Sequence, residues 1–303
     1  MSKRSLAFCL ILGLAVSAHA ATPNPAPGAK TTAAPKAASA TAAGPALPKL
    51  TAAQVADKNA AARGGLAKWR AVNAIEMSGR LDAGGKVDTY LPYTAQIKRP
   101  HKQRLSIKFA GQTAVQVFDG SKGWKLRPYL GRMDPEPFSA EELKKSAEQD
   151  FEGALIDYAA KGSKLDLEGT EAVDGKATYR LRLTAKDGHV QHLWIDGTTF
   201  LEAKIEGHPR RLDGKMRQVE TYPSDYRSVD GLMIPYVSET RVEGAHEGRK
   251  LTVEKVVLNP TLDDALFSKP PPLPAPAGGV VRNVPTVGAA TAVPAADPLA
   301  AMP

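Results

Sequence analysis

Apolar and polar residues alternate along much of the chain between residues 51 and 269. A period of two is typical of strands that bury one face. Asp-Gly pairs, which favour the tight turns of β-hairpins, interrupt the alternation at residues 119, 174, 187, 196, 213 and 230. The pattern therefore predicts antiparallel strands joined in sequence order. It lacks the alternation of strands and helices that marks a parallel nucleotide-binding sheet.

Helical periodicity replaces this pattern at the start of the region. A helix is predicted to begin at Thr51, where Gln54 completes a capping box, and to present Leu66, Trp69 and Val72 at helical spacing. The two glycines just before Leu66 lower its stability by roughly 1 kcal/mol each relative to alanine. Close packing of this helix on a sheet would explain why they are tolerated.

Two further helices are predicted later in the chain. One begins at Ser139, where Glu142 completes another capping box, and a third short helix is expected around residues 155–159. Many strands and few helices indicate a mostly β, α+β fold. We expect a single curved antiparallel sheet covered by two or three short helices.

Alternate side chains of a strand point to opposite faces of the sheet, so the alternation also assigns faces. The residues assigned to an apolar face in the first strands are Leu91, Tyr93, Ala95 and Ile97, followed by Leu105, Ile107 and Phe109. Charged residues occupy the other face. The helices either complete a solid core with this apolar face or leave a cavity that an apolar ligand fills.

Arg99 is a charged residue in the apolar register, at the end of its predicted strand. Its side chain either lies at the mouth of a cavity and hydrogen-bonds a covering helix, or extends past the strand end into solvent. Geometry alone leaves both interpretations open.

The first twenty residues have the three parts of a secretory signal peptide. Lys3 and Arg4 precede an apolar run over residues 6–16, and Ala18-His19-Ala20 supplies a cleavage site. We expect cleavage after Ala20 and a periplasmic location. Cys9 lies inside the apolar run, so neither a lipid anchor nor a disulfide is expected in the mature chain.

Composition divides the rest of the chain into a domain and two tails. Residues 21–50 and 270–303 are rich in Pro and Ala and are predicted to be disordered, which leaves residues 51–269 as one domain. The formal net charge of +8, which falls to +6 without the signal peptide, is spread along the chain. Nucleic acid is not an expected partner of an exported chain without a basic run. The protein is expected to be a monomer.

Catalytic and metal-binding motifs are missing from the sequence. It contains neither a G-x-S-x-G elbow nor a phosphate-binding glycine loop. His189 and His192 are close in sequence, but a separation of three places them on opposite faces of a strand. We therefore expect no enzyme activity, cofactor or metal.

One stretch of the chain resembles a known family. Ile97-Lys98-Arg99-Pro100 is followed by a strand, then by the run from Gln116 to Trp124 with its Asp-Gly turn, and then by Pro128. This resembles the outer-membrane lipoprotein-sorting (LolA/LolB-like) superfamily. The resemblance implies an unclosed β-barrel lidded by helices, with an apolar cavity for acyl chains. It also implies that Arg99 bonds the lid and gates the cavity.

The resemblance and the face assignments together predict a periplasmic carrier or receptor for a lipid or a lipidated protein, with possible acceptor proteins at the inner or outer membrane. The residues expected to line its cavity are Leu91, Tyr93, Ile97, Leu105, Ile107, Phe109 and Trp124. Two alternatives remain open. One is a periplasmic lipid sensor that binds a signalling partner, and the other is an envelope hydrolase with scattered site residues.

Overall fold

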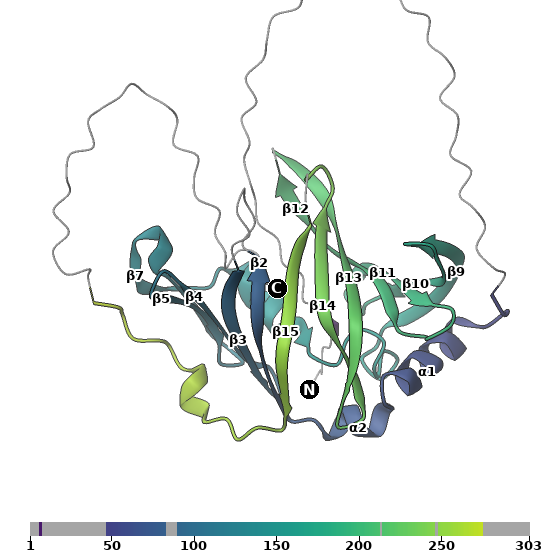
Figure 1. Ribbon diagram of the computed structural model, residues 1–303, viewed down its shortest axis with the longest axis horizontal. Coiled ribbons are helices and arrows are strands. Elements are labelled where there is room, and N and C mark those ends of the chain that lie inside the picture. Colours follow the sequence, from purple (N-terminus) through teal and green to yellow (C-terminus); the bar gives the residue numbers. More distant parts are fainter. Residues whose placement is uncertain (1–5, 8–46, 83–89, 213, 246–247, 275–303) are drawn as a thin grey trace, which may run out of the picture.

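The fold is known from a computed structural model that describes residues 6–7, 47–82, 90–212, 214–245 and 248–274 of the 303. Its main element is a 13-stranded sheet in the order β7-β6-β5-β4-β3-β2-β15-β14-β13-β12-β11-β10-β9. Neighbouring strands pair antiparallel, and the sheet does not close into a barrel (Figure 1). The predicted fold class is confirmed: a mostly β domain with three short helices.

The strands of this sheet are β2 (Ala74–Asp82), β3 (Tyr90–Lys98), β4 (Lys102–Phe109), β5 (Gln112–Phe118), β6 (Gly123–Arg127), β7 (Arg132–Pro137), β9 (Lys164–Val173), β10 (Lys176–Thr184), β11 (Val190–Asp196), β12 (Glu202–Leu212), β13 (Lys215–Val229), β14 (Leu232–Val242) and β15 (Arg249–Leu258). The helices are α1 (Ala52–Ala62), α2 (Leu66–Ala71) and α3 (Ala140–Glu148), with 3-10 turns η1 (Pro128–Leu130) and η2 (Asp264–Phe267). A separate parallel pair joins β1 (Leu6–Ala7) to β8 (Gln149–Asp150).

Two runs of consecutive strands meet in the middle of the sheet. β2 to β7 form one run and β9 to β15 the other, and the seam between them is the pairing of β2 with β15, where Leu81 lies opposite Leu251. β7 and β9 are therefore the two free ends of the sheet. In Figure 1 they lie on either side of the central strands, and the sheet between them is bent.

The Asp-Gly pairs form the turns that the sequence predicts. The five pairs that lie wholly within the described residues each join two consecutive antiparallel strands. At Asp174-Gly175 and Asp230-Gly231 both residues have positive φ, the backbone of a tight hairpin turn that Asp and Gly tolerate. Local turn chemistry thus fixes most of the order of the strands.

The first predicted helix is two helices, which corrects the prediction of one. α1 begins with the expected capping box between Thr51 and Gln54, but the chain breaks at Gly64 and Gly65, whose φ angles are +105° and +92°. A side chain at Gly64 would meet the carbonyl oxygen of Gly231 at 2.2 Å. The glycines therefore let the helix pair approach the β13–β14 turn closely, as their presence suggested.

The second predicted helix is confirmed and the third is not. α3 begins with the predicted capping box, in which Ser139 and Glu142 exchange hydrogen bonds. Residues 155–159 form turns instead of a helix. Leu155 and Ile156 are both almost fully buried, but they pack in different apolar clusters. Consecutive side chains drawn toward different parts of the core explain why a regular helix does not form.

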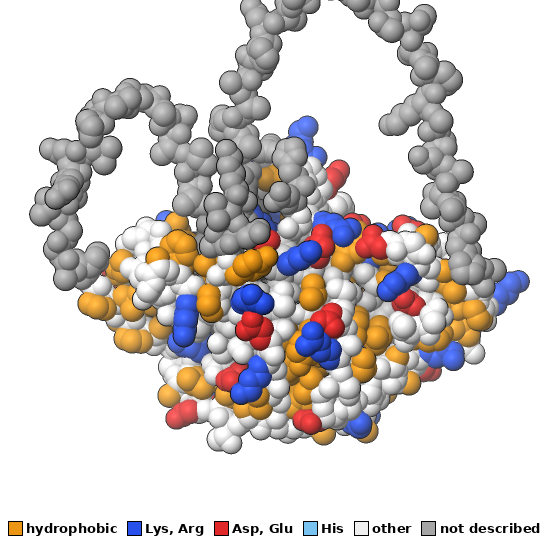
Figure 2. All heavy atoms as spheres, viewed as in Figure 1, with side chains coloured by type: hydrophobic (Ala, Val, Ile, Leu, Met, Phe, Trp, Pro, Cys, Tyr) orange, Lys and Arg blue, Asp and Glu red, His pale blue; other side chains and the backbone are white. Residues whose placement is uncertain are grey.

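The core lies on the concave face of the sheet. The residues from β2 and β3 that face it pair across the strands as Ile75 with Ile97, Met77 with Ala95 and Leu81 with Leu91. The opposite face, seen in Figure 2, carries Lys, Arg, Asp and Glu side chains interspersed with apolar ones. The predicted division into an apolar and a charged face therefore holds for the central strands.

The other face is also apolar at β5 and β6, where the chain after β15 covers it. Phe267 and Leu262 pack there against Val117 and Leu126, and Trp124 is packed against the same cluster. The backbone N–H of Leu273 donates to the carbonyl of residue 133 in β7. This segment thus stabilises both a face and an end of the sheet.

The chain also packs against the domain just before α1. Leu47 and Leu50 contact the apolar cluster of β10 and β11, and the hydroxyl of Tyr179 donates to the carbonyl of Pro48 at 2.8 Å. Apart from Leu6 and Ala7 in β1, the predicted signal peptide lies outside the described residues, and so do most of both predicted tails. No helix in the described part of the chain combines the length and apolar composition needed to cross a bilayer.

Candidate functional site

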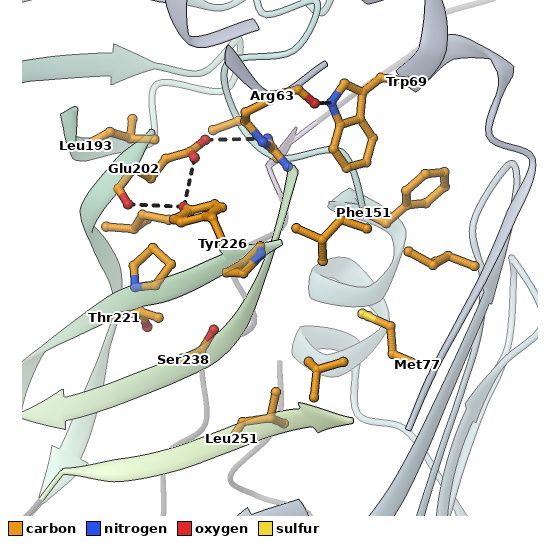
Figure 3. A pocket seen from close by; sticks show the side chains of 18 residues that line it. Arg63, Trp69, Met77, Phe151, Leu193, Glu202, Thr221, Tyr226, Ser238 and Leu251 are labelled. Carbon is orange, nitrogen blue, oxygen red and sulfur yellow. Dashed lines mark hydrogen bonds and ion pairs between the residues drawn. The ribbon is translucent and has the colours of Figure 1, made fainter. Parts of the chain in front are cut away.

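A cavity lies between the concave face of the sheet and the segments that cover it (Figure 3). Strands β2 and β11 to β15 contribute one side, and α2 and residues 151–154 contribute the other. The lining residues used below are Arg63, Trp69, Met77, Phe151, Glu202, Thr221, Tyr226, Ser238 and Leu251. The predicted alternative of a cavity, rather than a wholly solid core, matches this geometry.

The cavity is small, with a volume of about 100 Å³. Pockets for small organic ligands usually measure about 300–1,000 Å³. A long acyl chain would therefore fit only if the covering segments moved away from the sheet.

The lining is apolar on one side and polar on the other. Trp69, Phe151 and Met77 lie together on the apolar side in Figure 3, whereas Glu202 and Tyr226 lie on the opposite side with Thr221. A ligand in this space would contact hydrocarbon along one side and hydrogen-bonding groups along the other.

Arg63 and Glu202 form a buried ion pair at the polar side. Arg63 follows the last residue of α1, and its Nη1 lies 3.4 Å from Oε1 of Glu202, the first residue of β12. The same Nη1 donates to the carbonyl of Glu152, and the guanidinium lies over the ring of Trp69, 4.5 Å from its centroid. The hydroxyl of Tyr226 donates to Oε2 of Glu202 at 3.1 Å. Both charges are therefore held by several partners, as buried charges require.

Arg99 ties the end of β3 to the covering segments. Its Nε donates to the carbonyl of Val72 at 2.7 Å and its Nη2 to that of Trp69 at 3.3 Å, both at the end of α2. Nη2 also bonds the carboxylate of Glu152 at 2.9 Å, and the guanidinium lies 4.6 Å from the ring centroid of Phe151. Arg99 thus contacts both segments that cover the cavity.

A second pair joins the same two segments. The guanidinium of Arg70 in α2 binds both carboxylate oxygens of Asp157, at 2.9 and 2.5 Å. These hydrogen bonds hold the pKa of Asp157 below its usual value. Lys161 also lies 3.2 Å from Glu152, a contact within the turns at residues 151–161 that links their two ends.

The predicted cavity residues lie in three places. Leu91, Tyr93 and Ile107 are buried on the concave face with Leu105 packed against them, and Ile97 lies on the same face beside Ile75, which lines the cavity. They flank the cavity lining without being part of it. Phe109 is 41% exposed at a strand end, and Trp124 lies on the opposite face beneath the segment after β15.

Tyr93 is the one predicted cavity residue with an unsatisfied polar group. Its hydroxyl is buried and has no hydrogen-bond partner among the described residues. Burial raises the pKa of this tyrosine above its usual value. The hydroxyl therefore stays protonated at any ordinary pH.

The polar residues of the site were not predicted from the sequence. Arg63 precedes the Gly64-Gly65 pair, and Tyr226 lies between Asp225 and Arg227, which form an exposed ion pair with each other at 2.6 Å. Nothing in the local pattern connects Arg63 with Glu202, which follows it by 139 residues. Only the break after α1 could have drawn attention to this position.

His189 and His192 have different side-chain partners. His192 bonds Glu206, whereas the ring of His189 stacks on that of His208 with centroids 4.7 Å apart. Burial, together with the neighbouring His189, lowers the pKa of His208. In the described part of the chain, no three His, Cys, Asp or Glu side chains are grouped so that they could hold a metal ion.

Neither protein-family models nor curated proteins match this chain. Solved structures do match it. A LolA superfamily protein from Nitrosomonas europaea is 17% identical over 73% of this chain and 99% of its own, with a TM-score of 0.49. The chain is similar to LolA superfamily structures. This is the superfamily that the stretch from Ile97 to Pro128 resembles.

Two other solved structures match a similar share of this chain. A domain assigned to outer membrane lipoprotein sorting, from Vibrio parahaemolyticus, is 13% identical over 71% of this chain and 95% of its own, with a TM-score of 0.48. A DUF1329 family protein from Desulfovibrio piger is 14% identical over 72% and 97%, with a TM-score of 0.49. At these identities the likeness concerns the fold.

Proposed function

We propose that this protein is a periplasmic carrier or receptor that holds a lipid, or the acyl chains of a lipoprotein, in the cavity beneath α2 and residues 151–154. The observation that carries the proposal is the cavity itself, which lies between an apolar sheet face and two covering segments attached by polar contacts. The resemblance of the Arg99 motif to lipoprotein-sorting proteins also supports it.

Binding would require the covering segments to open. Each methylene buried on binding contributes about 0.8 kcal/mol, so a long chain provides enough free energy to offset several lost polar contacts. The contacts that would break first are those of Arg99 with α2 and Glu152 and those of Arg70 with Asp157. They are polar and partly exposed, so water can replace them at moderate cost. Transfer of the ligand would involve no covalent chemistry.

The proposal is tested by native mass spectrometry of the protein isolated from the periplasm of its producing cell, followed by solvent extraction. We expect a mass above that of the bare chain and recovery of one lipid, or one lipidated protein, per molecule. A bare-chain mass under gentle conditions, with no lipid in the extract, would refute a carrier. Recovery from the cytoplasm alone would refute the location.

A further inference from the structure

The charges that line the cavity cancel one another. Arg63 and Glu202 are the charged residues in the lining, and they form an ion pair with each other. Their side chains are only 8% and 7% exposed. Arg99 and Lys161 lie nearby but do not line the cavity, and both pair with Glu152. The polar side of the cavity therefore offers hydrogen bonds without a net charge.

Arg63 retains an unused donor. Its Nε is buried and has no hydrogen-bond partner among the described residues, although Nη1 is bonded to Glu152 and Glu202. A buried donor without an acceptor costs about 1–3 kcal/mol. A ligand oxygen that reached this nitrogen when the covering segments open would recover that cost, so a ligand that carries an acceptor is favoured.

Hydroxyl groups continue the polar side along the neighbouring strands. Thr221 on β13 and Ser238 on β14 line the cavity and are each less than a tenth exposed. The hydroxyl of Thr221 lies 3.4 Å from that of Thr240, a long and therefore weak contact. These hydroxyls can donate to a second oxygen of the same ligand.

We propose that the cavity selects acyl lipids whose polar linkage is uncharged, such as an ester or an amide, over fatty-acid anions. This inference rests on the proposed function. A carbonyl oxygen accepts from Arg63 without bringing charge into the cavity. A carboxylate would lie beside Glu202, whose own charge already neutralises Arg63, and like charges placed together without water repel strongly. The selectivity for uncharged ligands therefore comes from the ion pair of Arg63 with Glu202 and not from the size of the cavity.

The test compares methyl palmitate with palmitate, which have the same chain, at a mildly alkaline pH where palmitate is ionised. Binding is measured by native mass spectrometry and by quenching of tryptophan fluorescence. We expect the intact protein to prefer methyl palmitate by about tenfold or more. Equal affinities, or a preference for palmitate, would overturn the selectivity and leave the carrier function standing. Failure of both probes to bind would refute both proposals.

Removing the charge of Glu202 tests whether this residue causes the ligand preference. Glu202→Gln keeps the size of the side chain but removes the charge that neutralises Arg63, so the preference should shift toward palmitate by about tenfold. Glu239→Gln is the matched control, because Glu239 lies on the opposite face of β14 and bonds Arg241. An unchanged ratio in folded Glu202→Gln would overturn the assignment. The ratio in the unaltered protein remains a test even if this variant does not fold.

Discussion

The guanidinium of Arg99 donates to the buried carboxylate of Glu152 at 2.9 Å, which joins the end of β3 to the turns at residues 151–161. The side chain of Arg99 is 32% exposed and that of Glu152 only 6%. Water can therefore replace the hydrogen bonds of Arg99, whereas the side chain of Glu152 must move before water can reach it. We therefore propose that opening of the cavity begins on the arginine side of this pair.

Replacing Arg99 with leucine tests its predicted role as a gate. We expect a bound fluorescent fatty-acid ester to exchange faster, because the variant loses the bonds to α2 and Glu152. The free energy of unfolding should fall by about 1–3 kcal/mol, because the buried carboxylate of Glu152 loses one of its hydrogen-bond donors. Arg132→Leu is the control, since Arg132 pairs with Glu136 at the end of the sheet. Unchanged exchange with lower stability would make Arg99 purely structural.

The break between α1 and α2 can be tested at two adjacent glycines. Both have positive φ, but a Cβ at Gly64 would meet Gly231, whereas one at Gly65 would meet nothing within 4 Å. Gly65→Ala should cost about 1–3 kcal/mol from backbone strain alone. Gly64→Ala should cost more, as measured by urea denaturation. Equal losses would show that the close approach to the β13–β14 turn does not matter.

Asp264 provides a prediction about pH. Its carboxylate bonds Lys102 and Lys98, which lowers its pKa to about 2 from 3.8. The folded pKa lies below the unfolded one, so the stabilisation is fully present above about pH 4 and is lost as pH falls toward 2. A carboxyl NMR titration of the folded protein should find this midpoint, with Asp264→Asn identifying the signal. A midpoint near 4 would show that the lysines do not hold this carboxylate.

Two phenylalanine substitutions distinguish the covered face from the exposed strand end. Phe267, in the segment after β15 that covers β5 and β6, is 1% exposed, so Phe267→Ala should lower the free energy of unfolding by about 3–5 kcal/mol. Phe109→Ala, at a residue 41% exposed, should cost less than about 1 kcal/mol. Urea midpoints give both values. A ligand affinity that falls in Phe109→Ala would support its predicted place near the ligand.

Sequence reasoning succeeded where the cause was local. The alternation along β3 and the Asp-Gly turns predict an antiparallel meander, and Thr51 and Ser139 mark the starts of two helices. It did not predict which face of the sheet Trp124 occupies, because the apolar face of β6 is turned away from the concave face and is covered by the chain after β15. Arg63 and Glu202 pair because the bend of the sheet brings the start of β12 close to the end of α1. No local sequence pattern predicts that bend.

The pairing of β2 with β15 has a consequence for how the molecule is made. A ribosome produces β2 long before β15, so the seam at the centre of the sheet cannot close until nearly the whole domain has been synthesised. Pairing of segments so distant in sequence is slow. The delay leaves the edge of β2 open, and this is where one unfinished molecule would pair with another and aggregate.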